Sequence, residues 1–113
     1  MVRSDSIPGK MVINHEANDT LVRTITISSG GTPVDFTGAT IKVYISNKED
    51  EDPFATITDG SGLVSSDLAN GEIKIFWQTA DVLEPHKHYW YKLEVTFNDN
   101  RVKTYLEDKL HTV

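Results

Sequence analysis

Two histidines separated by one residue, His86 and His88, are the first candidates for chemistry in this chain. On an extended backbone alternate side chains point to the same side, so the two imidazoles could begin a zinc site. The other histidines, His15 and His111, are distant in sequence, and the chain contains no cysteine. A structural zinc site needs four ligands, which this pair does not supply. The pattern therefore favours a polar loop, and we predict no metal site; a metal-dependent enzyme would have to be built on His86 and His88.

Two further segments contain reactive residue types, and their spacing favours a structural role. Glu49, Asp50, Glu51 and Asp52 are consecutive acids, but a calcium loop needs alternate spacing and a central glycine, so we expect a solvated acidic loop. Asp59-Gly-Ser-Gly62 lacks the spacing of a nucleophile elbow and reads as a turn. The sequence has no glycine-rich phosphate loop and no distinctive pair of carboxylates. We predict that the protein is not an enzyme and uses no cofactor.

The aromatic residues are divided by strand register into two sets. Trp77, Tyr89, Tyr91 and Phe97 share faces with aliphatic residues and are predicted to lie in the core. The hydroxyl of Tyr89 or of Tyr91 is expected to bond the backbone of the preceding connection, as in a tyrosine corner.

The second aromatic set falls on the opposite strand faces, where it alternates with lysines. If the strands are adjacent, the set forms an exposed cluster of the kind that marks a protein contact. The alternative is that aromatic residues simply favour strands and are half covered by lysine stems. The predicted interface has Tyr44, Phe76 and Trp90 as anchors, Tyr105 as a further member, and Lys42, Lys74 and Lys92 setting the register.

The elements that must position these residues are short strands. Alternation of apolar and polar residues predicts strands over 21–27, 40–47, 54–58, 72–77, 88–98 and 101–106, separated by turn residues. A short apolar stretch over 10–15 is expected to be a further strand, and 34–36 a short extended stub. The longest helix expected is one turn at 79–83. With about eight or nine strand candidates, the pattern predicts an all-β fold, an immunoglobulin-like antiparallel β-sandwich of about 7–9 strands.

The composition restricts the classes of function. The 113 residues suit a single domain spanning 1–113, in which we expect 1–9 to be flexible. The net charge is -6 and the basic residues are scattered, which disfavours binding to nucleic acid. No window approaches the roughly 18 apolar residues that a transmembrane helix needs, and no signal peptide is evident. We therefore expect no membrane partner and no export by a standard signal.

Several of these segments together resemble a known family. Asn18-Asp19 enters a strand, Gly31 to Val43 leads into the next, and Asn70 to Asp81 and Tyr89 to Val95 follow before a closing hairpin. This order resembles the immunoglobulin-like N-terminal domain of phage baseplate upper proteins, over most of the chain from about Asn18 onward. The chain departs from that pattern at 84–88, where such domains usually have a glycine before the tyrosine.

The resemblance implies a non-enzymatic structural protein of a bacteriophage virion, in the tail, the baseplate or the capsid surface. Its partners would be other virion proteins or further copies of itself in a homo-oligomer, and it would be made in the host cytoplasm. The alternative from another class is a carbohydrate- or surface-binding β-sandwich module that uses Trp90 and Tyr44 as a stacking platform.

Overall fold

The structure, a computed structural model, describes residues 11–78 and 82–113. Its regular elements are ten strands and one 3-10 turn, and the described residues contain no α-helix, which confirms the predicted all-β class. The predicted flexible segment 1–9 lies outside the described residues, as does most of the predicted helical turn at 79–83. The elements are β1 (Ile13–His15), β2 (Thr20–Thr26), β3 (Ser28–Ser29), β4 (Thr32–Pro33), β5 (Thr40–Ser46), β6 (Ala55–Asp59), β7 (Gly62–Asp67), η2 (Leu68–Asn70), β8 (Glu72–Gln78), β9 (His88–Thr96) and β10 (Val102–Thr112).

Eight of the strands form one sheet in the order β1-β10-β9-β5-β6-β7-β8-β2, and β3 and β4 form a separate two-stranded hairpin. Most neighbours are antiparallel, as expected. Two ladders are not: β1 pairs with β10 in parallel, and β6 pairs with β7 in parallel through only two residue pairs. The predicted antiparallel pairing therefore holds for most ladders but not for these two, because alternation along a strand carries no information on the direction of its neighbour.

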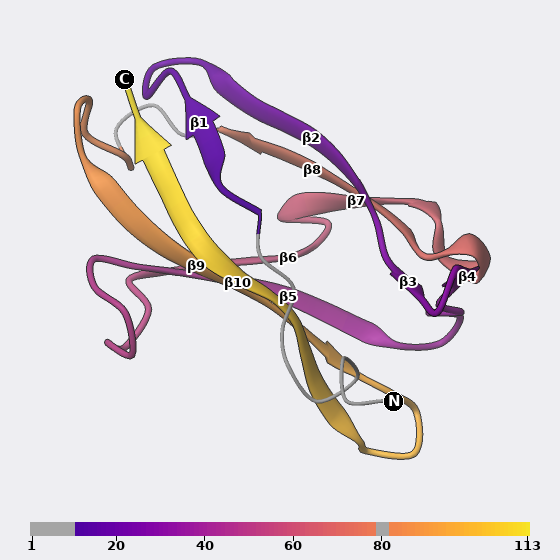
Figure 1. Ribbon diagram of the computed structural model, residues 1–113. Coiled ribbons are helices and arrows are strands. Elements are labelled where there is room, and N and C mark those ends of the chain that lie inside the picture. The colour runs from indigo at the N-terminus through magenta and orange to yellow at the C-terminus, as the bar shows by residue number, and fades with distance from the viewer. Residues whose placement is uncertain (1–10, 79–81) are drawn as a thin grey trace.

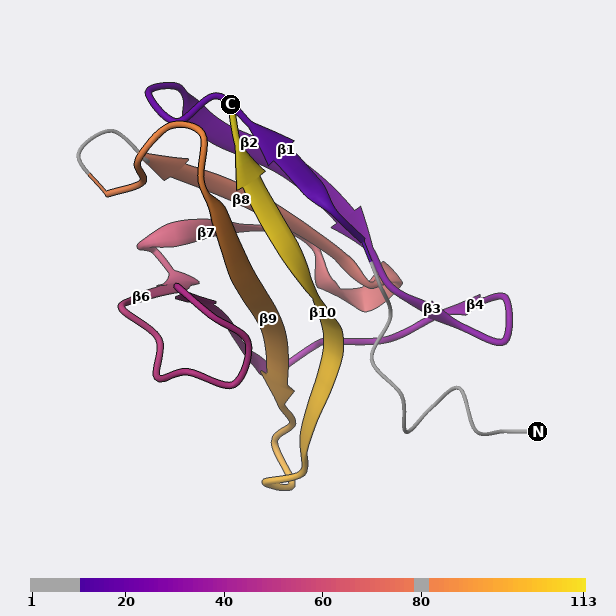
Figure 2. The same ribbon diagram turned by 60° about the vertical axis from the view of Figure 1, so that its left-hand side comes forward.

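The sheet curls so strongly that its two ends approach each other (Figure 1). The outermost strands, β1 and β2, run close together in both ribbon views, whereas the β3–β4 hairpin projects from the body (Figure 2). Arg23 of β2 links these ends, since its guanidinium donates a hydrogen bond of 2.6 Å to the Asn14 carbonyl of β1. The result is a nearly closed sheet with an enclosed interior.

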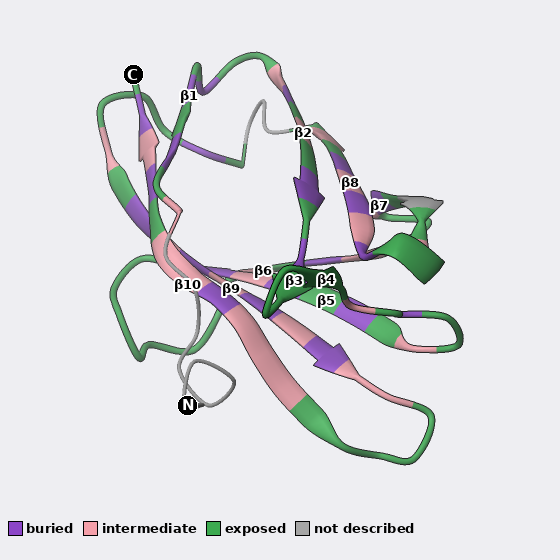
Figure 3. Cartoon of the chain, turned by 45° about the vertical axis from the view of Figure 1, so that its right-hand side comes forward, coloured by how far each residue is buried: buried purple, intermediate pink, exposed green. Residues whose placement is uncertain are grey.

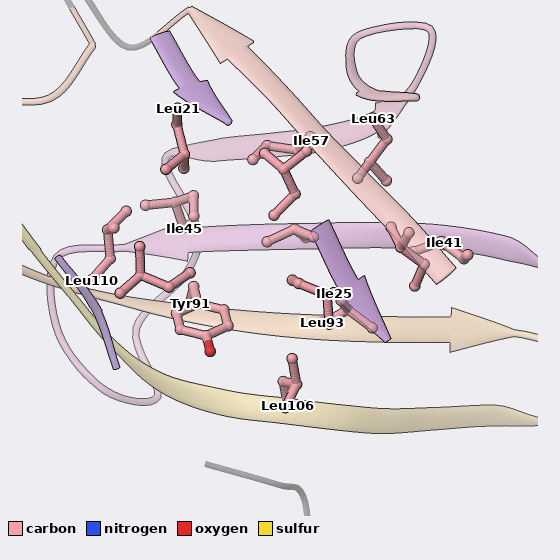
Figure 4. Packing of buried hydrophobic residues seen from close by; sticks show 14 of the residues in the cluster. Leu21, Ile25, Ile41, Ile45, Ile57, Leu63, Tyr91, Leu93, Leu106 and Leu110 are labelled. Carbon is pink, nitrogen blue, oxygen red and sulfur yellow. The ribbon is translucent and has the colours of Figure 1, made fainter. Parts of the chain in front are cut away.

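The interior is filled by side chains from both halves of the sheet. Figure 4 shows Leu21, Ile57 and Leu63 facing Tyr91 and Leu93 across the enclosed space. Buried residues alternate with exposed or half-buried ones along the strands (Figure 3), so each strand contributes every second side chain. The buried strand residues include Ile41, Val43, Ile45, Ile73, Ile75, Leu93 and Val95, together with Tyr89 and Tyr91 of the predicted core set.

Trp77 and Phe97, which were also predicted to be in the core, lie at its margin. Both are only partly buried and pack against the buried cluster. Phe97 is the residue after β9 and closes the β9–β10 hairpin, where its N–H donates to the Arg101 carbonyl at 2.8 Å. A strand end is less covered than a strand centre, which explains the partial burial.

The tyrosine corner forms at Tyr89. Its hydroxyl accepts a hydrogen bond of 2.8 Å from the N–H of Glu84, in the connection before β9. Tyr91 does not share this role: its hydroxyl donates to the Met11 carbonyl, and burial, followed by the charge of Asp108, raises its pKa. The predicted corner is therefore confirmed, and the structure assigns it to the first of the two tyrosines.

Candidate functional site

Tyr44 and Trp90 lie on the outer face of two neighbouring strands, as predicted. Tyr44 is on β5 and Trp90 on β9, and the register places Tyr44 opposite Lys92 and Ser46 opposite Trp90. The two aromatic residues are thus diagonal neighbours, a separation that long side chains can span. Both are half-buried, and their chain neighbours on the strands point into the core. Lys42, which is exposed, shares this outer face and lies opposite Glu94.

Phe76 and Lys74 belong to a different surface, so their place in the predicted cluster is wrong. They are on β8, which is separated from β5 in the sheet by β6 and β7. Their outer-face neighbours are Val22 and Thr24 of β2, and Phe76 remains 49% exposed. The alternation correctly predicted that Phe76 faces outward, but it could not predict which strand lies beside β8.

Tyr105 does not join the outer face either, and this part of the prediction is also wrong. The β10–β9 register shifts between Thr104 and Leu106, which leaves Tyr105 as the extra residue of a β-bulge. Its ring packs edge-on against Phe36, with 5.4 Å between the ring centroids, and it lies against the core. A bulge breaks the period of two, so alternation counted through it assigns the wrong face.

The loop between β5 and β6 rises beside Tyr44 and Trp90. Its base is closed by the Phe54 N–H, which donates to the Ile45 carbonyl at 2.9 Å. Inside the loop, the Ser46 hydroxyl and the Glu51 N–H both donate to the Lys48 carbonyl, at 2.9 and 3.2 Å. Asp50 adopts a positive φ of 62°, a conformation that aspartate tolerates better than most residues. These bonds give the acidic run a defined shape.

A pocket of about 220 Å³ lies between this loop and the outer face of β5, β9 and β10. Aromatic surface and carboxylates dominate its lining, and the acidic loop forms one of its walls. The sequence predicted the acids to be solvated, and they are exposed, but it gave no sign that they face an aromatic pair. The lining residues are Tyr44, Ser46, Glu49, Asp50, Glu51, Pro53, Trp90, Tyr91, Lys92, Glu94 and Glu107.

The charges around the pocket are unbalanced. Five lining residues carry carboxylates and one, Lys92, carries an ammonium group. Lys92 is 3.7 Å from Glu107, and the Tyr44 hydroxyl donates to Glu94 at 3.3 Å. Partial burial, followed by the charge of Glu94, raises the pKa of Tyr44, so its hydroxyl stays protonated and keeps its hydrogen bond to Glu94. The pocket can therefore offer carboxylate acceptors beside flat aromatic surface.

The histidines take another arrangement. The ring of His88 on β9 stacks on that of His111 on β10, with 4.1 Å between centroids and an interplanar angle of 18°. His86 lies in the preceding loop with a positive φ of 56°. In the part of the chain that the structure describes, no three His, Cys, Asp or Glu side chains gather where they could hold a metal ion.

Comparisons of the chain with protein-family models and with curated proteins give no match. Within residues 11–78 and 82–113, no helix has the length and apolar character needed to cross a membrane.

Proposed function

We propose that this protein is a non-enzymatic structural component of a bacteriophage virion, in the tail, the baseplate or the capsid surface, that acts through protein contacts. The observation that carries the proposal is the pair of Tyr44 and Trp90 beside a pocket on the outer face of β5 and β9. Aromatic residues in partly enclosed positions supply much of the energy of protein interfaces.

The strand order supports the immunoglobulin-like part of this proposal. In a variable-type immunoglobulin domain the strands B, E and D form one layer and the strands C′, C, F and G the other. Here β2, β8 and β7 follow the first order, and β6, β5, β9 and β10 follow the second. The Tyr89 corner stands at the start of the strand equivalent to F, where such domains have their tyrosine corner. The curled sheet is thus proposed to be an immunoglobulin-like sandwich whose layers meet at β6 and β7.

The first test is the mass of the protein in solution, by light scattering behind a sizing column over a range of concentrations. We expect the wild type to form a defined homo-oligomer. Trp90→Ala should shift the distribution toward the monomer while the melting temperature changes little, because Trp90 lies outside the core. Phe76→Ala is the matched control, since it removes an exposed aromatic ring from the other surface, and it should leave the mass unchanged.

The virion assignment needs a separate test. Antibodies raised against the protein should label particles purified from a phage lysate of its source, at the tail, the baseplate or the capsid. If light scattering shows the wild type to be a monomer at every concentration, the partner in the virion would be another protein and not a further copy of this chain. Purified particles without the protein would contradict the virion role.

A second candidate, a carbohydrate-binding module, is favoured by the combination of Trp90, Tyr44 and carboxylates in one pocket, because sugars stack on aromatic rings and bond to carboxylates. A glycan array would distinguish the two. Strong signal from one class of neutral sugar, lost in Trp90→Ala, would favour this module over the structural protein.

A further inference from the structure

The pocket beside Trp90 has properties that select the chemistry of its ligand. Three of its carboxylates, those of Glu49, Asp50 and Glu51, come from the β5–β6 loop, and their side chains make no ion pair among the described residues. The other two, on Glu94 and Glu107, come from β9 and β10. The loop therefore brings negative charge to a place where the strands already provide it.

This concentration of charge favours a cationic ligand. Carboxylates gathered around one pocket make its electrostatic potential negative, and a negative potential attracts cations. Lys92 offsets only part of it, because five carboxylates face one ammonium group. A neutral ligand would gain nothing from this potential, whereas a cation would be attracted by it.

The aromatic wall and the size of the pocket narrow the choice further. A guanidinium group is planar, stacks on aromatic faces and bonds carboxylates through two parallel N–H groups, which an ammonium group cannot do. The ammonium of Lys109 lies 5.5 Å from the centroid of the Trp90 ring, so an incoming guanidinium has to share this ring with Lys109 or displace it. At about 220 Å³ the pocket is smaller than the roughly 300–1,000 Å³ of typical small-molecule sites, and it suits one side chain better than an oligosaccharide.

We infer that the pocket between the β5–β6 loop and the outer face of β5, β9 and β10 receives an arginine side chain of a protein partner. This inference rests on the proposed function, because it states which chemical group of the partner contacts the outer face of β5 and β9 around Trp90. The guanidinium stacks on the aromatic wall formed by Trp90 and Tyr44, and the loop carboxylates accept its N–H groups. Binding weakens as salt is added, because the attraction is between charges at a surface.

The test uses the full chain and three peptides that differ at one side chain. The probes are acetyl-Gly-Arg-Gly-amide, the same peptide with citrulline, which has nearly the same shape and no charge, and the same peptide with lysine. Binding is followed by ¹H–¹⁵N NMR, in which Trp77 and Trp90 give separate indole signals. We expect saturable shifts of the Trp90 indole and the loop amides with arginine, about threefold weaker binding with lysine and none with citrulline. The Trp77 indole, on β8, should not move.

Two double variants provide the matched comparison. Glu49→Gln with Glu51→Gln removes two loop charges and should weaken binding of the arginine peptide at least about fivefold. Glu16→Gln with Asp59→Asn removes two exposed charges that do not line the pocket, and it should leave the affinity unchanged. Equal binding of citrulline and arginine, or no saturable shift at low salt, would overturn the inference. Shifts of Trp90 with a neutral sugar but with none of the peptides would overturn it in favour of a carbohydrate site.

These outcomes are separable from those of the proposed function. The peptide titration reports on the pocket alone, whereas antibody labelling of particles reports on the virion role alone. Binding of the arginine peptide by a protein that is absent from particles would leave the pocket chemistry standing and remove the phage assignment. If the antibodies label the particles but the arginine peptide causes no shift, the virion role would stand and the proposed pocket chemistry would be wrong.

Discussion

At position 71 the backbone needs a residue without a side chain. Gly71 follows η2 with a φ of 71°, in the left-handed region, and its N–H donates to the Leu68 carbonyl. A Cβ atom there would lie 2.5 Å from the Ile27 carbonyl oxygen and 2.9 Å from that of Val34. These contacts are with backbone atoms, so a rotation of side chains cannot relieve them. The absence of a side chain at Gly71 thus allows the turn before β8 to pack directly against the backbone of Ile27 and Val34, between β2 and β5.

The substitution Gly71→Ala should therefore destabilise the protein by about 3 kcal/mol or more, from the left-handed conformation and the backbone clash together. Gly30→Ala is the control, because Gly30 has a similar φ of 60° and nothing within 4 Å of the added atom. It should cost only about 1 kcal/mol. Urea unfolding followed by tryptophan fluorescence measures both, and equal costs would show that the clash at Gly71 is relieved by backbone movement.

At the scale of the element, the β9–β10 ladder contains one histidine, His111, that should make stability depend on pH. His88 and His111 stack across the ladder, and the buried Nε2 atom of His111 has no hydrogen-bond partner. Burial, followed by the positive charges of His88 and Lys109, lowers the pKa of His111 from its usual 6.5, and Asp108 opposes this in part. The neighbour on β1 is Asn14, which carries no charge.

A histidine whose pKa is lower in the folded state than in the unfolded state makes the protein less stable as the pH falls. Above pH 6.5 the ring is neutral in both the folded and the unfolded chain. As the pH falls below 6.5, the unfolded chain binds a proton that the folded chain does not, so the free energy of unfolding decreases. Unfolding in urea between about pH 5 and pH 8 should show this loss on the acidic side.

His111→Phe keeps an aromatic ring in the stack and should flatten the pH dependence over this range. His86→Asn is the matched control: it removes a histidine from an exposed loop position with positive φ, which asparagine tolerates. It should keep the wild-type slope. A steep slope that persists in His111→Phe would assign the dependence to other groups.

The strand patterns predicted the faces of elements better than their neighbours. Ile41, Val43 and Ile45 are buried as the period of two requires, because the period is a property of one strand. Phe76 was misplaced because pairing is decided by the whole fold, and Tyr105 because a bulge shifts the phase of β10. Each error arises where information from outside the strand decides the outcome.

For the candidate site, too, the sequence predicted which face of a strand each residue occupies but not the shape of the loop beside it. Tyr44, Trp90, Lys42 and Lys92 share a face because β5 and β9 are neighbours and each alternates. The pocket wall was missed, because four consecutive acids carry no signal for the way a loop folds back. That shape depends on the bond from Phe54 to Ile45 and on the φ of Asp50, which exist only in the folded chain.

At the scale of the whole molecule, the two halves of the sheet share one core but are joined by a short ladder. Within the described residues, β6 pairs with β7 through Thr58 with Gly62 and Asp59 with Leu63. The buried cluster, in contrast, takes residues from both halves, with Ile57 fully buried. Burial of apolar surface contributes far more to stability than two ladder pairs, so the shared core should decide how the chain unfolds.

We therefore expect one cooperative unfolding transition, as the prediction of a single domain requires. The two tryptophans make this measurable, because Trp77 is on β8 in one half and Trp90 is on β9 in the other. In Trp77→Phe the fluorescence reports on β9, and in Trp90→Phe it reports on β8. The urea midpoint from tryptophan fluorescence should coincide with that from far-UV circular dichroism of the same variant.

The substitution Leu93→Ala, added to each of these two variants, tests whether the halves unfold together. It removes a fully buried side chain of β9, so it should destabilise the protein by about 2–5 kcal/mol and lower the urea midpoint seen by Trp77 as well as that seen by Trp90. A Leu93→Ala effect seen by Trp90 alone would mean that the halves unfold separately and that the β6–β7 ladder is a boundary between two folding units.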